Sequence, residues 1–180
     1  MFLVGESMKI DMERIRLSGR ESWEFIFKSS GSNEYFQDIG GKYQEKLKVN
    51  LRVDKAGKHF LARGRIITVL ELQCSRCLEK FIYPVDVDFN VYLVDSEHQE
   101  EFCREDEVLF YSNDELDIKP YVEETVLADI PLIPLCNTQC EGLCSECGHN
   151  LNISKCSCRH DYVDPRWEKL KEFKAGKEVT

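Results

Sequence analysis

Nine cysteines dominate the chemistry of this 180-residue sequence, and eight of them stand in paired spacing. A C-x2-C pair occurs at Cys74 and Cys77 and again at Cys144 and Cys147. Such a pair at a tight turn can hold one ion at about 2.3 Å, and two pairs complete a four-thiolate zinc site. Segment 136–158 has few other apolar residues, so burial in an apolar core accounts poorly for the pattern. The predicted metal ligands are Cys74, Cys77, Cys136, Cys140, Cys144, Cys147, Cys156 and Cys158.

The spacing allows two partitions of these eight cysteines between two structural zinc ions. In the simpler partition, the four cysteines of 144–158 form a local site, and the pair before them reaches back to Cys74 and Cys77. In the rival partition, the four cysteines of 136–147 share one ion. Both leave zinc fully coordinated by thiolates, which is typical of a structural and not a catalytic ion.

Iron–sulfur ligation and redox chemistry fit the cysteines less well than zinc does. Iron–sulfur ligation is the alternative metal chemistry. A redox-active C-x2-C pair needs a strand-to-helix setting that this region lacks. With four thiols for each ion, His149 and His160 are expected at the surface or behind the ligands. Cys103 stands alone in an acidic stretch and is expected to be a plain thiol.

Three segments alternate apolar and polar residues at the period of a β-strand: 46–54, 59–73 and 81–94. Short turns connect them, and the first C-x2-C pair falls in the second turn. Gly64 lies in the apolar row of its segment and suggests a bulge or bend. Long alternating strands with short connections predict an antiparallel meander with one solvated face, twisted strongly enough to be barrel-like.

The residues after the strands predict a loop and two helices. Residues 95–116 are acidic and predict a long loop that carries a short strand at 108–111. Asp117 is the predicted N-cap of a helix that ends before Pro131. An Asp-Pro pair at 164–165 predicts the start of a last helix.

The predicted fold class is therefore α+β. Residues 8–130 are expected to form an antiparallel β domain with a twisted, barrel-like sheet, an acidic loop and a covering helix. Residues 131–180 are expected to form a small Cys-rich zinc-binding annex that ends in a helix. The cysteine spacing would join the annex to the sheet.

The net charge of −9 is unevenly distributed. Residues 1–85 hold 15 basic and 11 acidic residues, a net of +4, whereas residues 86–129 hold 2 and 15, a net of −13. The polar strand faces carry cations that could meet RNA, and Tyr92 on the same side could stack on a base. The acidic belt of 86–129 is expected to face away from RNA, because it would repel phosphates. The predicted RNA-binding residues are Arg52, Arg63, Arg65, Arg76 and Lys80.

No enzyme signature accompanies these features. Glu123 and Glu124 are expected on the solvated outer side of the predicted helix, where they would not form a rigid acid–base pair. A Gly-rich phosphate loop and triad spacing are absent. No apolar run reaches the ~20 residues of a membrane span, and the first residues lack the pattern of a signal peptide. We therefore expect a cytoplasmic protein that is not an enzyme and has no membrane partner.

Two cysteine stretches resemble the YceD family: CSRCL at 74–78, and PLIPLCNTQCEGLCSECGHNLN at 131–152. CSC at 156–158 and DPR at 164–166 extend the resemblance, which covers most of the chain from about Met8 to Phe173. Some family members keep only the first C-x2-C pair and have histidine near the positions of the next two cysteines. That variation favours the two-site partition.

The resemblance implies a role in the accumulation of large-subunit, 23S-type ribosomal RNA, through its synthesis, processing or stability. It implies metal binding, and it implies ribosomal RNA, large-subunit assembly intermediates or a ribosomal protein as partners. It names no catalytic residue. The alternative is a zinc-stapled protein-interaction adaptor that does not contact RNA. Salt-dependent RNA binding would distinguish the two, because phosphate contacts weaken steeply with salt.

Overall fold

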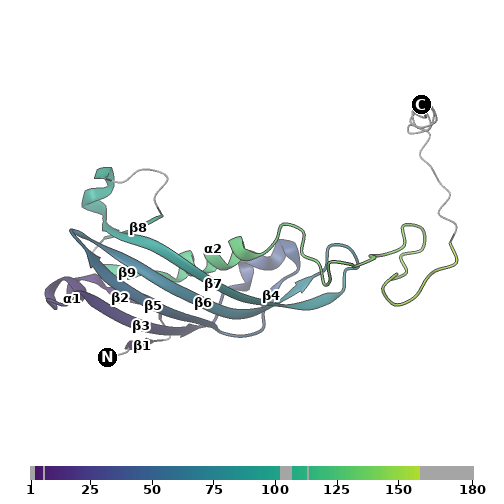
Figure 1. Ribbon diagram of the computed structural model, residues 1–180, viewed down its shortest axis with the longest axis horizontal. Coiled ribbons are helices and arrows are strands. Elements are labelled where there is room, and N and C mark those ends of the chain that lie inside the picture. The colour runs from purple at the N-terminus through teal and green to yellow at the C-terminus, as the bar shows by residue number, and fades with distance from the viewer. Residues whose placement is uncertain (1–2, 6, 102–106, 113, 159–180) are drawn as a thin grey trace, which may run out of the picture.

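The computed structural model describes residues 3–5, 7–101, 107–112 and 114–158 (Figure 1). The predicted last helix from residue 164, Cys103 and His160 lie outside these residues. None of the described helices is long and apolar enough to cross a membrane.

Three long strands form the centre of the molecule, as their alternation predicts. They are β5 (Leu47–Ala56), β6 (His59–Gln73) and β7 (Lys80–Asp95), joined by uninterrupted antiparallel ladders. Their apolar residues share one face, because side chains alternate along a strand. The buried row of β5 is Leu47, Val49, Leu51 and Val53.

Within the described residues, the main sheet has seven strands and is open. Its order is β1 (Leu3–Gly5), β3 (Ser22–Ser29), β5, β6, β7 and β8 (Val108–Tyr111), and β4 (Lys42–Tyr43) also pairs with β6. The outer pairs β1–β3 and β7–β8 are parallel, so the predicted antiparallel order holds only inside the sheet. The prediction of a barrel-like sheet is wrong in that β1 and β8 lie at opposite edges and do not pair.

A closed barrel would bury the inner face of the sheet within its own strands, whereas this open sheet buries that face against other elements. Figure 1 shows α2 (Lys119–Asp129) lying along this face, where it buries Val122 and Val126. The remaining elements include a small antiparallel ladder, one short α-helix and two 3-10 helices. They are β2 (Lys9–Asp11), β9 (Glu115–Asp117), α1 (Met12–Leu17), η1 (Asn33–Ile39) and η2 (Ser96–Glu101).

Local predictions around α2 and the acidic loop were close. The short strand at 108–111 is confirmed as β8, although η2 and β9 form where only loop was expected. Helix α2 begins at Lys119, whose N–H donates to Asp117 Oδ1 at 2.9 Å. The N-cap is therefore Ile118 and not Asp117 as predicted, although the Asp117 carboxylate still accepts a hydrogen bond from the first helical N–H.

Gly64 produces no bulge, contrary to the prediction. The ladders on both sides of β6 pass through it in register, opposite Leu51 and Phe89. A Cβ at this position would lie well under 3.0 Å from the ring of Phe89. Glycine is therefore required because an aromatic ring occupies the space above its Cα.

Candidate functional site

The two C-x2-C pairs form knuckles with the same backbone geometry. In the turn between β6 and β7, Leu78 donates its N–H to Cys74 O at 2.9 Å, and in the second pair Gly148 donates to Cys144 O at 2.9 Å. Both donors have positive φ, 60° for Leu78 and 72° for Gly148. The left-handed residue turns the chain sharply, which directs both cysteine side chains of each pair to the same side.

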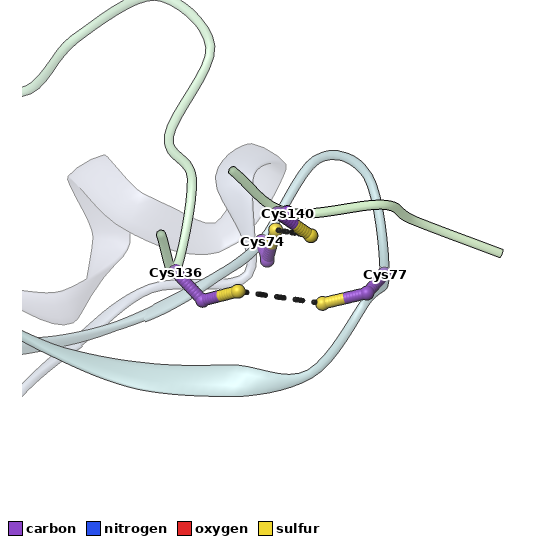
Figure 2. Close-up of side chains that lie close together, drawn as sticks. All are labelled: Cys74, Cys77, Cys136 and Cys140. Carbon is purple, nitrogen blue, oxygen red and sulfur yellow. Dashed lines mark hydrogen bonds between the residues drawn. The ribbon is translucent and has the colours of Figure 1, made fainter. Parts of the chain in front are cut away.

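The first sulfur group joins the sheet to the segment after α2. Cys74 Sγ lies 3.8 Å from Cys140 Sγ, and Cys77 Sγ lies 3.6 Å from Cys136 Sγ (Figure 2). A tetrahedral ion with four sulfur ligands at about 2.3 Å has sulfur–sulfur edges of about 3.8 Å, whereas a disulfide bond is about 2.05 Å long. All four cysteines are free, and their spacing fits one metal ion.

The second group is formed by the remaining paired cysteines. Within each group all four sulfur atoms lie within 4.8 Å of one another, so each group could hold an ion. This grouping is the simpler of the two predicted partitions. The groups differ in burial: three of four cysteines are buried in the first, and only Cys144 in the second. The second group consists of Cys144, Cys147, Cys156 and Cys158.

The electrostatics of both groups suit a bound cation. Burial opposes ionisation of Cys74, but backbone N–H groups, foremost that of Cys77, outweigh it and hold the pKa of this thiol at about 6. Backbone N–H groups of Cys147 and Glu146 likewise lower the pKa of Cys144 to about 6. In the same group, the contact with Cys147 and then burial raise the pKa of Cys158 to about 12. Crowded thiols resist joint ionisation, and a divalent cation removes that obstacle.

Polar contacts connect the two knuckles. Arg76 Nη1 donates to Cys140 O at 2.9 Å, and Leu143 N donates to Arg76 O at 3.2 Å. Asn152, which follows the second knuckle, donates from Nδ2 to Cys140 Sγ at 3.4 Å and accepts from Glu141 N at 2.8 Å. Arg76, predicted as an RNA-binding residue, thus supports the first group. The sequence analysis did not identify Asn152 as a residue that contacts a metal ligand. The only available signal was its position between Cys147 and Cys156.

Three of the predicted RNA-binding residues meet on the outer face of the sheet. Arg52 lies opposite Arg63 in the β5–β6 ladder, and both approach Asp54, at 2.9 and 3.9 Å. Together with Arg65 they line an open hollow of about 490 Å³. Two guanidinium groups share the Asp54 carboxylate here, and Glu24, which lies opposite Arg52 in the β3–β5 ladder, lines the same hollow, so the cations at this end are balanced by two carboxylates.

The other end of the outer face is neutralised by carboxylates. Arg65 donates twice to Asp86, at 2.6 and 2.6 Å, and lies opposite Asp88 in the β6–β7 ladder. The prediction that the whole acidic belt turns away from the cations is therefore wrong, because β7 brings its first residues onto the same face. Lys80, farther along, pairs with Glu71 at 3.1 Å.

Glu123 corrects a second expectation. Its side chain is buried, with 4% of the residue exposed, and accepts from Ser32 N at 2.6 Å. The Lys119 ammonium group lies 3.9 Å away. The chain before η1 covers this flank of α2, which helical periodicity could not reveal. The carboxylate holds the N-terminal segment against α2 and is not part of a solvated face.

His149 was expected at the surface or behind the metal ligands, and Tyr92 on the polar side of its strand. His149 Nε2 lies 2.8 Å from Ser154 Oγ and is in neither sulfur group. Tyr92 is 37% exposed on the outer face.

Comparison with known proteins identifies the family. The model of the family described as "Large ribosomal RNA subunit accumulation protein YceD" matches residues 62–174. An uncharacterized protein of Mycobacterium tuberculosis is 31% identical over 128 residues, 71% of this chain and 61% of the relative. The Arabidopsis thaliana protein named "Large ribosomal RNA subunit accumulation protein YCED homolog 1, chloroplastic" is 26% identical over 145 residues, 66% of this chain and 45% of the relative.

Another relative is the uncharacterized protein YlbN of Bacillus subtilis, 26% identical over 128 residues, 71% of this chain and 73% of the relative. The chain spans about three fifths of the length of the mycobacterial relatives that it matches. No solved structure matches it. With a family model that covers more than half of its residues and includes all eight cysteines of the two groups, this chain belongs to the YceD family.

Proposed function

We propose that this chain is a non-enzymatic factor that supports the accumulation of large-subunit, 23S-type ribosomal RNA in the cytoplasm. The observation that carries the proposal is the family match, which begins at residue 62 within β6 and extends over β7, α2 and both cysteine groups. Within that role, the eight paired cysteines would bind two structural zinc ions. Four thiolates with no other ligand type are a donor set that zinc favours.

Zinc would act on the architecture and not on a reaction. The first group would fix the segment after α2 to the β6–β7 turn, and the second would close the loop that follows. A four-thiolate site is full, so it offers no position for a reactive water. The cysteines would supply the negative charge, and the N–H donors around Cys74 and Cys144 would stabilise it.

The partner would be ribosomal RNA or a large-subunit assembly intermediate, met at the outer face of the sheet. Arg63 is the best candidate for a phosphate contact, because its nearest described carboxylate lies 3.9 Å away and is shared with Arg52. Arg65 is less suited, since Asp86 already accepts hydrogen bonds from its Nε and Nη2 and neutralises its charge. Phosphate contacts of this kind add affinity that falls as salt rises.

The test is Arg63→Glu in cells that depend on the variant, with Arg20→Glu as the control for the same charge change at another exposed site. The ratio of large- to small-subunit ribosomal RNA should fall for Arg63→Glu and stay normal for Arg20→Glu. Melting temperature and zinc content should match the parent in both. A normal ratio in a folded Arg63→Glu protein would exclude this face as the RNA contact.

A second candidate function is the adaptor that binds protein only. Asp86 and Asp88 favour it, because carboxylates on the outer face oppose RNA binding. Affinity purification from growing cells would decide between the two. Ribosomal RNA recovered at low salt and lost at higher salt supports direct RNA contact, whereas protein partners that persist after nuclease treatment support the adaptor.

A further inference from the structure

One edge of β7 remains open over most of its length. β8 pairs in parallel with residues 92–95 only, and no other strand in the described part of the chain continues along that edge. Tyr92 N donates to Glu107 O at 2.8 Å, on the side away from β6. Because the two sides alternate in an antiparallel ladder, Asp86, Asp88 and Asn90 also direct their N–H and C=O groups to the open side.

Pro84 limits this open stretch. Pro84 is an even number of residues from Tyr92, so its backbone nitrogen faces the same, open side of the strand. The N–H that proline lacks is therefore not needed for pairing with β6, and the β6–β7 ladder continues through Pro84. The stretch 85–91 is left, about 20 Å long at about 3.3 Å per residue. A partner strand there would continue the line of β8 along the same sheet.

A groove borders this edge. It has a cavity volume of about 610 Å³ between β7 and α2, and Phe89, Tyr121 and Ala128 are among its lining residues. Tyr121 packs edge-on against Phe89 at 5.5 Å and donates to Glu107 Oε2 at 3.0 Å. We call this space the edge groove. It combines unpaired backbone groups with an apolar floor, which are the two requirements for adding a strand.

The charge of the edge groove is negative. Asp88, Glu107 and Glu124 line it, and no lysine or arginine is among its described lining residues. Two copies joined edge to edge would place Asp86 and Asp88 against carboxylates, which is unfavourable between directly opposed strands. RNA would meet the same repulsion. Pro84 and the acidic residues also protect the edge from unspecific pairing.

We propose that the edge groove binds a basic, extended segment of a partner protein as an added β-strand beside residues 85–91. Alternate side chains of the segment would face the acidic lining at Asp88 as cations, since Asp86 is already paired with Arg65, and the others would pack toward Phe89 as apolar residues. The proposal does not depend on RNA contact at the outer face, and its failure would leave that contact untouched.

The probe is a fluorescent seven-residue peptide that alternates lysine and valine, with fluorescence anisotropy as the measurement. One comparison peptide replaces lysine by glutamate, and another keeps lysine but carries N-methyl groups on alternate backbone nitrogens. The lysine peptide should bind saturably. The glutamate peptide and the N-methyl peptide should bind at least tenfold more weakly, the latter because it cannot complete the ladder. Equal binding of the N-methyl peptide, or no binding of the lysine peptide, would overturn the proposal.

Two variants of the zinc-loaded chain test the location. Asp88→Pro removes an edge N–H that β6 does not use, as Pro84 already does, and should weaken binding at least tenfold. Asp88→Asn removes the charge only and should weaken it no more than about fivefold. Equal affinity of the two variants would contradict strand addition. A dimer that Asp88→Pro converts to a monomer would assign the edge to a second copy. If Asp88→Pro loses zinc or melts early, the N-methyl peptide on the parent protein decides.

Discussion

Asn152 is expected to control metal binding at a group to which it contributes no ligand. Its amide Nδ2 donates to Cys140 Sγ in the first group, while its Oδ1 accepts from Glu141 N. Asn152→Asp keeps the acceptor and the shape of the side chain but removes the N–H donor. It also places a carboxylate beside a thiolate ligand. The substitution also removes the hydrogen bond that Nδ2 donates to Asn150 Oδ1 at 2.8 Å, so Asn150→Ala, which loses that bond but keeps the N–H···S contact, is measured beside it.

The size of the effect follows from the contact. A hydrogen bond to a charged group contributes about 1.5–3 kcal/mol, and outer-sphere substitutions typically cost 10- to 100-fold in metal affinity. Asn152 is exposed and its N···S distance is 3.4 Å. Water can replace part of such a contact, so we expect the lower end, about tenfold weaker binding at the first group.

The assay must read the two groups separately. Zinc-loaded protein is titrated with a chelator and alkylated, and peptide mapping by mass spectrometry reports which cysteines have become reactive. Asn152→Asp should expose Cys74 and Cys77 to alkylation at about tenfold less chelator. Asn137→Asp is the matched control, since it adds the same charge near Cys140 and keeps its Oδ1 acceptor for a backbone N–H. An unchanged first group, or a shift confined to the second group, would refute the reasoning.

Metal content, packing and a buried charge provide three further tests. Protein purified without chelator should carry two zinc ions by elemental analysis, and the Cys144→Ser variant should carry one. Chelation should unfold residues 131–158 before the sheet, because zinc binding supplies ~10–16 kcal/mol of folding free energy in a segment with few apolar residues. Gly64→Ala should lower the free energy of unfolding in urea by about 1–3 kcal/mol through overpacking against Phe89, and adding Phe89→Leu should restore part of it; an unchanged Gly64→Ala would disprove the clash. Glu123→Ala should cost about 1–3 kcal/mol by leaving a backbone N–H without its acceptor, and Glu123→Gln should cost less; equal costs would mean that the charge matters and the acceptor does not.

The sequence alone predicted those elements whose signal is local. Alternation located β5, β6 and β7 and their buried faces, because the side-chain period of a strand is visible in a few consecutive residues. Helix α2 and β8 were likewise found within a few residues. The same alternation at Phe25 and Phe27 could have revealed β3, since both side chains are buried on the inner face.

The cysteine groups show how far spacing can reach. Cys144 and Cys147 are close in the chain, and a tight turn suffices to bring their sulfur atoms together. Cys74 and Cys140 are 66 residues apart, so spacing left two partitions open. The ladder between β6 and β7 and the path of the chain after α2 place them side by side. The sequence therefore determined which residues could bind metal, and the tertiary structure decided which of them share a site.

Tertiary structure also decided what lies next to each face. Periodicity states that Arg65 and Asp86 each point to a polar side, but only the β6–β7 register brings them into contact. Periodicity also places Glu123 on one flank of α2, but it cannot show that the segment around Ser32 covers this side chain. It cannot tell an open sheet from a closed one, because alternation defines a buried face and not what buries it. Closure, burial of polar groups and the open edge of β7 all depend on contacts between segments distant in the chain, which no local pattern encodes.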